Sequence, residues 1–216
     1  MSVGKLEGGL WWWTAMHPDW KPEQSWDAEV RCFYVETDDA TLVVDPLVAE
    51  SAERIWEALD RDVERRGLPV CVLLTQAAHA RSAGDVARRY GGEVWGPHQA
   101  RSEIGGTVFH AVAPGESMPG GRVLELEQEP GGSGTPLYFP SYAAIATGDV
   151  FISRDDGLRV WWGHGASDDR WYHERLLPSL RRWLDLPLRH LLVAHGDLVG
   201  PEELGAALER PPDRGL

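Results

Sequence analysis

The chain of 216 residues carries 34 acidic and 21 basic residues, a formal net charge of −13 at pH 7. Because such a field repels phosphate backbones, we expect no nucleic-acid partner. A hydrophobic fraction of 43% with 25% charged residues is typical of a globular protein, and the length suits residues 1–216 forming a single domain.

The sequence contains no segment that predicts export or membrane insertion. Its first ten residues, MSVGKLEGGL, lack the apolar core of a signal peptide, and no apolar stretch approaches the roughly 18 residues of a membrane span. Cys32 and Cys71 each lie in an apolar run where a thiol behaves as a small hydrophobic group. We therefore expect a cytoplasmic protein without a membrane partner, and two reduced, buried cysteines.

The first half of the chain alternates strands and helices. Alternating side chains place Trp11 and Trp13 on one face of the first strand and Trp12 on the other. One-sided apolar spacing predicts a helix over 49–66, and Ser82 is the expected cap of a second helix that runs to residue 90. The strands expected around these helices are 11–14, 31–37, 41–44, 70–75 and 93–97.

The second half changes to short strands separated by Pro and Gly, followed by a helix, a strand and a last helix. Two sheets with helices on their outer faces define an α+β protein, a four-layered αββα sandwich. The expected strands are 108–112, 122–127, 136–139, 143–147 and 190–194, and the expected helices are 171–184 and 201–208.

The order of these pieces resembles the metallo-β-lactamase superfamily from about residue 12 to residue 208. The resemblance rests on "LLT" before a polar turn, "EPGGSGTP", "ATGDV" and "LLVAHGD". Members of that family carry a Thr-His-x-His-x-Asp-His run, a Pro-Gly-His turn, a Gly-Asp and a last His. On this chain the corresponding metal-binding positions are Gln76, Ala78, Ala80, Arg81, Gly132, Asp149 and His195.

The resemblance therefore implies the fold but not the family's metal chemistry. A catalytic zinc needs about three protein ligands, and Ala and Gly offer no donor side chain. With only Asp149 and His195 retained, we predict a degenerate metal site and no cofactor. A buried Asp149 would then need another cation. We expect Arg81 to form an ion pair with Asp149, with His195 hydrogen-bonded nearby.

Other histidines leave an alternative open. His79 stands one residue from a family position and is interpreted either as a ligand or base, or as a hydrogen-bonded, partly buried side chain. His17 and His164 lie in loop segments and could join Asp149 and His195 around one Zn or Fe ion at low occupancy.

Eleven tryptophans form the remaining unusual feature. The groups at 11–13 and 161–162, with Trp20 and Trp26, are expected near the rim of the site, where Trp13 and Gln76 would contribute to a pocket for an apolar or aromatic ligand. The alternative is an inter-subunit contact or packing beneath loops.

Three functions follow from these features. The leading hypothesis is a metal-free relative that binds a small molecule, or performs metal-independent chemistry, in the retained cleft. The alternative is a hydrolase of esters, lactones or thioesters with a single non-standard metal site. A third hypothesis makes the tryptophan-rich face the contact surface of a homo-oligomer.

Overall fold

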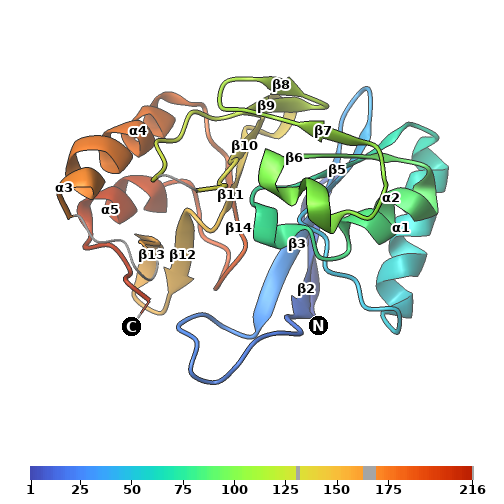
Figure 1. Cartoon of the computed structure of the whole chain (residues 1–216), viewed down its shortest axis with the longest axis horizontal. Coiled ribbons are helices and arrows are strands. Elements are labelled where there is room, and N and C mark those ends of the chain that lie inside the picture. Colours follow the sequence, from blue (N-terminus) through green and yellow to red (C-terminus); the bar gives the residue numbers. More distant parts are fainter. Residues whose placement is uncertain (130–131, 163–168, 216) are drawn as a thin grey trace.

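The computed structural model describes residues 1–129, 132–162 and 169–215. Within these residues, two large β-sheets lie face to face, and helices cover the outer face of each sheet (Figure 1). This arrangement is the four-layered αββα sandwich that the sequence predicts.

The first sheet has the strand order β1-β2-β3-β4-β5-β6-β7. Its first four strands pair antiparallel, and the pairs from β4 to β7 are parallel. The order follows the chain: short turns join β1 to β2 and β3 to β4, a longer loop joins β2 to β3, and helices join most of the later strands. The strands are β1 (Val3–Glu7), β2 (Leu10–Met16), β3 (Glu29–Glu36), β4 (Thr41–Val44), β5 (Val70–Leu73), β6 (Glu93–Gly96) and β7 (Phe109–Ala111).

The second sheet has the order β14-β11-β10-β9-β8, and a separate hairpin is formed by β12 and β13. Strands β11 and β14 pair parallel, so their carboxyl ends lie at the same edge. Four strands, β1, β8, β12 and β13, were not predicted from the sequence. The strands are β8 (Ser117–Met118), β9 (Gly121–Val123), β10 (Leu137–Phe139), β11 (Ala144–Gly148), β12 (Phe151–Arg154), β13 (Gly157–Val160) and β14 (His190–Val193).

Helices α1 (Glu53–Arg66) and α2 (Ala83–Tyr90) cover the first sheet (Figure 1). Each is followed by a glycine in the left-handed conformation, Gly67 at φ 59° and Gly91 at φ 61°, as expected for helix ends. Ser82 does not cap α2 as predicted. Its hydroxyl instead accepts from the Val48 N–H and donates to the Val48 carbonyl.

The second sheet is covered by α3 (Asp169–Trp171), α4 (Leu177–Arg181) and α5 (Glu203–Glu209) (Figure 1). The regular helix expected over 171–184 is irregular, because a π-helical turn separates α3 from α4. Pro178 lies in the first turn of α4 and lacks an N–H to continue the regular hydrogen-bond ladder. The last helix also begins later than predicted, at Glu203 instead of residue 201.

The hydrophobic core lies in layers that match the sandwich. Side chains from both sheets, among them Phe33, Leu73 and Phe139, fill the space between them. Trp13 packs on the helix side of the first sheet, and Trp12 packs against the layer between the sheets. The predicted alternation of the tryptophans is therefore confirmed.

Both cysteines are free and buried, as predicted. Among the helices in the described ranges, none combines the length and the apolar character that a membrane crossing requires.

The two sheets approach each other closely near their carboxyl edge, at Gly148 on the end of β11. Its φ of 55° lies in the left-handed region, and a Cβ built there would lie 2.5 Å from the Thr75 hydroxyl oxygen. A side chain at residue 148 would therefore both strain the backbone and push apart the two sheets.

We predict that Gly148→Ala destabilises the protein by clearly more than Gly67→Ala in urea denaturation. Gly67 has a similar φ of 59° but open space around it, so its replacement should cost only the backbone strain of about 1–2 kcal/mol. Equal losses for the two variants would show that the contact with Thr75 does not restrict residue 148.

Candidate functional site

Three side chains from separate parts of the sequence meet at the carboxyl ends of the central strands. His79 ends a 3-10 turn that follows β5, Asp149 directly follows β11, and His195 follows β14 after one intervening residue. The parallel pairing of β11 with β14 brings Asp149 and His195 together. We call His79, Asp149 and His195 the trio.

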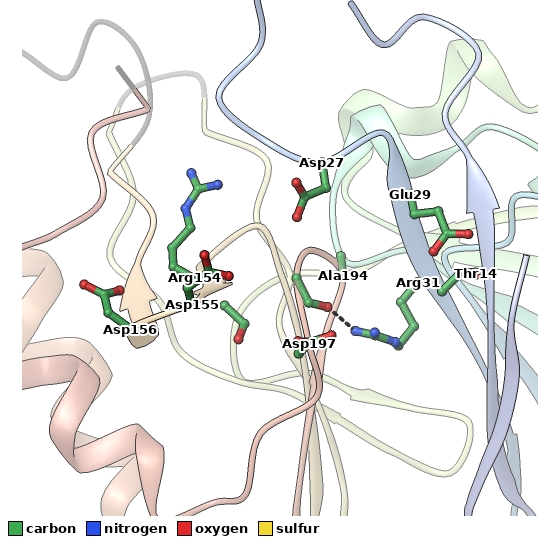
Figure 2. Close-up of a pocket in the computed structure, with 11 residues that line it drawn as sticks. Thr14, Asp27, Glu29, Arg31, Arg154, Asp155, Asp156, Ala194 and Asp197 are labelled. Carbon is green, nitrogen blue, oxygen red and sulfur yellow. Dashed lines mark hydrogen bonds between the residues drawn. The ribbon is translucent and has the colours of Figure 1, made fainter. Parts of the chain in front are cut away.

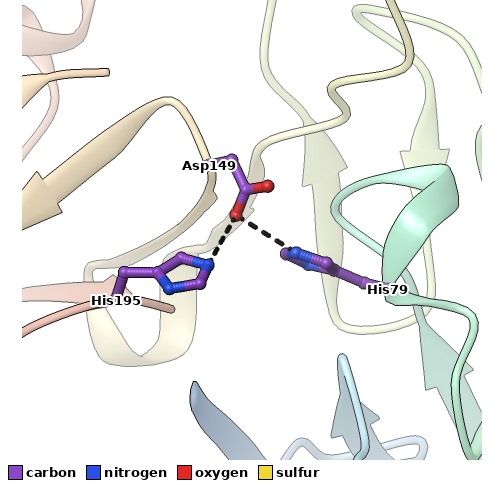
Figure 3. Close-up of side chains that lie close together, drawn as sticks. All are labelled: His79, Asp149 and His195. Carbon is purple, nitrogen blue, oxygen red and sulfur yellow. Dashed lines mark ion pairs between the residues drawn. The ribbon is translucent and has the colours of Figure 1, made fainter. Parts of the chain in front are cut away.

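The trio is centred on one carboxylate oxygen. Asp149 Oδ1 lies 3.1 Å from Nε2 of His79 and 3.3 Å from Nε2 of His195 (Figure 3). The other oxygen, Oδ2, accepts a hydrogen bond of 2.8 Å from the Gln76 side-chain amide. The histidine side chains are 1% and 3% exposed, whereas that of Asp149 is 23% exposed. Asp149 is therefore the member of the trio that a ligand can reach.

A second carboxylate holds His79 from behind. Asp45, which follows β4 and is 3% exposed, has its Oδ2 3.0 Å from Nδ1 of His79. Thr75 holds Asp45 in turn, because its backbone N–H donates to Asp45 Oδ1 at 2.8 Å and its hydroxyl donates to Oδ2. The imidazole of His79 thus lies between two carboxylates, one on each ring nitrogen.

This arrangement fixes the charges of the trio. Burial by itself lowers the pKa of His79, but Asp149 and Asp45 outweigh it and raise the pKa from its ordinary 6.5 to about 9. Burial likewise raises the pKa of Asp149, but His79 and His195 hold that pKa well below its ordinary range. At neutral pH His79 is an imidazolium beside an ionised Asp149.

The predicted ion pair between Arg81 and Asp149 does not form. Among the residues that the structure describes, the buried Nε and Nη1 atoms of Arg81 have no hydrogen-bond partner, and the side chain lines a different pocket together with His17. Arg81 has a φ of 22°, outside the usual helical or extended range, which redirects the chain at this turn. The side chain that pairs with Asp149 is His79 instead of Arg81.

The other residues singled out from the sequence are not brought into the trio. Trp13 is fully buried beneath α1, and its indole N–H donates to the Leu47 carbonyl. His17 lies in the loop after β2, where its ring packs edge-on against Trp26. His164 lies outside the described residues.

A pocket of about 340 Å³ opens beside the trio. Asp149 and Gln76 lie at its polar end, and tryptophans form much of its wall. The indole N–H groups of Trp161 and Trp162 are buried, and within the described residues they have no hydrogen-bond partner. The rest of the lining comprises Leu126, Glu127, Gln128, Glu129, Gly132, Ser133, Gly134, Val150, Trp171 and Leu176.

Arg31 on β3 fixes the loop that carries His195. Its backbone N–H donates to the Ala194 carbonyl at 2.8 Å, and its guanidinium Nη1 donates to the Gly196 carbonyl at 2.6 Å. Figure 2 shows this guanidinium contact in a polar pocket of about 510 Å³ that borders the loop. The Ser153 N–H holds the His195 carbonyl from the hairpin side at 3.1 Å. The backbone around His195 is therefore held by the first sheet and by the β12–β13 hairpin.

Sequence reasoning missed the roles of Asp45, Thr75 and Arg31. Asp45 carried a usable signal, since an acid directly after a buried strand in "VVDP" lies at the carboxyl edge where sites form. Arg31 carried none, because its partners are backbone carbonyls more than 160 positions away in the sequence.

Comparison with known proteins extends the fold assignment. No protein-family model and no curated protein matches the sequence. Among solved structures, the metallo-β-lactamase FIM-1 from Pseudomonas aeruginosa in its mono-zinc form matches with a TM-score of 0.65 and 13% identity, covering 96% of this chain and 93% of that chain. A metallo-β-lactamase from Hirschia baltica matches with a TM-score of 0.63 and 14% identity, covering 96% of each.

A metallo-β-lactamase family protein from Thermus thermophilus matches with a TM-score of 0.60 and 18% identity, covering 94% of this chain and 78% of that chain. The αββα sandwich is the class of fold that these matches support. The chain therefore has the metallo-β-lactamase fold.

The metal ions that this fold implies can be tested against the residues present. Of the positions that the resemblance assigns to the metal site, Ala78, Ala80 and Gly132 have no donor side chain. The trio does offer a His-Asp-His set whose candidate ligand atoms all lie within 4.8 Å of one another. The donor types fit one ion held by three ligands.

We predict that the free energy of unfolding falls as the pH rises into the alkaline range, because the His79 ring then loses the proton that its contacts with Asp45 and Asp149 stabilise. Its folded pKa of about 9 lies above the ordinary 6.5, so the stabilisation is complete below about pH 6.5 and is lost as pH rises through 9. The loss is up to about 3 kcal/mol. Urea denaturation between pH 6 and 10, with a chelator present, measures it.

His79→Gln should remove most of this pH dependence, whereas His98→Gln, at an exposed histidine, should retain it. An NMR titration that places the His79 ring pKa at or below 6.5 would contradict the assignment of an imidazolium.

We predict that Arg31→Met lowers the free energy of unfolding by about 1–3 kcal/mol, because the carbonyls of Val193 and Gly196 lose a charged donor. Arg61→Met, which removes an exposed arginine paired with Asp62, should cost less than about 1 kcal/mol. Urea denaturation compares the two variants. If they lose the same amount, Arg31 does not hold the His195 loop.

Proposed function

We propose that this protein binds a small molecule with an apolar or aromatic body in the pocket beside the trio, without a metal ion. The observation that carries the proposal is the position of His79, with Nδ1 3.0 Å from Asp45 and Nε2 3.1 Å from Asp149. The metal site of the fold is degenerate in this proposal, and the imidazolium takes the place of the metal charge.

Charge balance supports the metal-free state. A buried carboxylate is costly unless a cation accompanies it. His79 provides that cation for Asp149, and its Nε2 proton occupies the nitrogen that a metal would need. Since a metal binds only the deprotonated nitrogen, an ion at the trio has to displace this proton.

The lining of the pocket indicates the kind of ligand. Its volume of about 340 Å³ lies within the range of small-molecule sites, though at the lower end. Trp161, Trp162 and Trp171 offer flat apolar surface. At the polar end of the pocket, Asp149 can accept a hydrogen bond from a ligand, and the Gln76 side-chain amide can donate one. A compact ligand with an apolar body and polar acceptor atoms fits these groups.

A second candidate function is a single-metal hydrolase of ester, lactone or thioester substrates. It is favoured by the convergence of the trio and by two buried atoms, Asp149 Oδ1 and His195 Nδ1, that lack a partner of hydrogen-bond geometry within the described residues. His79, Asp149 and His195 would hold the ion. A bound Zn²⁺ would polarise a substrate carbonyl and lower the pKa of a water molecule.

We predict that protein purified without added metal contains far less than one equivalent of Zn or Fe by elemental analysis. A panel of neutral aromatic esters, lactones and thioesters should contain compounds that bind, detected by tryptophan fluorescence, with the same affinity before and after EDTA. Trp161→Ala should weaken that binding about tenfold, equivalent to roughly 1.4 kcal/mol.

The matched control is Trp56→Ala, which removes a tryptophan of α1 that packs beneath Arg89 and lines none of the pocket described above. Stoichiometric metal that is lost on chelation together with hydrolysis of the same compounds would establish the second candidate. Equal weakening by both tryptophan variants would exclude the pocket as the binding site.

A further inference from the structure

Arg81 is a charged side chain that the trio leaves unused. Arg81 lies two residues after His79, which ends the 3-10 turn, and Arg81 is only partly exposed. Its Nε and Nη1 atoms are buried, and no described residue forms a hydrogen bond with them. No carboxylate in the described ranges forms an ion pair with it either, since the carboxylate expected to do so, Asp149, is held by His79 and His195.

An unpaired guanidinium in this position is energetically unfavourable. Arginine remains protonated in proteins, so it cannot relieve burial by losing its charge. Buried donors without acceptors cost about 1–3 kcal/mol, and more where the group is charged. A ligand that brings acceptor oxygens to the partly exposed side of the Arg81 guanidinium would offset part of this cost.

The side chain lines a pocket of about 560 Å³. Ala77, Ala78 and Ala80, which have small side chains, line the same pocket. His17 lines the opposite loop, and its Nδ1 already accepts the Asp19 N–H, which leaves Nε2 available to a ligand. Gln99, Glu103, Pro18, Asp19, Leu47 and Ser82 complete the lining.

This pocket borders the trio without being part of it. The ring of His17 packs edge-on against Trp26 with centroids 5.0 Å apart, and Trp26 packs edge-on against His195 at 5.1 Å. The chain of rings places the Arg81 pocket on the side of the trio that faces the loop between β2 and β3. The aromatic pocket of Trp161 instead includes Asp149 and Gln76.

We propose that Arg81 and His17 form a binding site for a small oxyanion, the carboxylate or phosphate group of a ligand. A guanidinium donates two parallel hydrogen bonds to either group, which makes the contact both strong and directional. The acids Asp19 and Glu103 at the same pocket limit the site to a ligand of small negative charge. This inference goes beyond the function proposed above and requires neither a metal-free trio nor an aromatic ligand.

The overall charge makes the site simple to test. At a formal charge of −13, the protein repels anions in general, so stabilisation by a dilute anion points to a local site. The probes are inorganic phosphate and acetate, each titrated at constant ionic strength, with chloride as the reference anion. Thermal unfolding and isothermal titration calorimetry are the measurements.

The Tm of the wild-type protein should rise with the concentration of phosphate, of acetate or of both. The anion that gives the larger rise in Tm identifies whether the site prefers a phosphate or a carboxylate group. Arg81→Gln should weaken the calorimetric affinity at least tenfold and abolish the rise in Tm. Arg81→Lys, which keeps the charge but loses the fork of donors, should retain part of it. Glu103→Gln should strengthen binding, because it removes a negative charge from the pocket.

Arg54→Gln is the matched control, since it removes an exposed arginine of α1 and should leave the response unchanged. Without anion, Arg81→Gln should be at least as stable as wild type, whereas loss of a structural ion pair would lower its Tm. Trp161→Ala should keep the anion response, which separates this site from the aromatic pocket. No stabilisation of wild type by either anion, or equal responses in wild type and Arg81→Gln, would overturn the proposal.

Discussion

The interaction on which the site depends is the imidazole of His79 held between Asp45 and Asp149. Asp45 belongs to the end of β4 in the first sheet, and Asp149 follows β11 in the second. A single cationic ring therefore joins the two halves of the sandwich at their carboxyl edges. Without it, two carboxylates and the ring of His195 would face one another with no compensating charge. The cation has to come from the protein in the absence of metal, and this chain places it on a ring that reaches both acids.

The surrounding residues make this geometry rigid. Thr75 restrains Asp45 through its N–H and its hydroxyl, and Gly148 allows the second sheet to approach Thr75 closely. Arg31 and Ser153 hold the backbone on either side of His195. The contact of Gly148 with Thr75 joins the two sheets. Arg31 joins the first sheet to the loop after β14, and Ser153 joins the β12–β13 hairpin to the same loop. The site is thus positioned by packed secondary structure and not by mobile loops, which suits pre-organised binding.

Much of the fold could be predicted from the sequence, whereas the geometry of the site could not. The apolar runs of β4, β5 and β14 and the glycines after α1 and α2 act locally, so periodicity and turn chemistry reveal them. The short strands β12 and β13 carry no such pattern. Within the site, Asp149 and His195 followed from the family's motif positions. The role of His79 did not, because it depends on a contact with Asp45, which lies far from His79 in the sequence.

The pairing of His79 with Asp149 has consequences on both sides of the trio. His79 pairs with Asp149, and no carboxylate of the described residues forms an ion pair with Arg81, which lines a pocket together with Ala77, Ala78 and Ala80. On the other side, Asp149 keeps one oxygen for Gln76 at the polar end of the tryptophan-lined pocket. The trio therefore borders two separate pockets, one lined by tryptophans and one lined by Arg81.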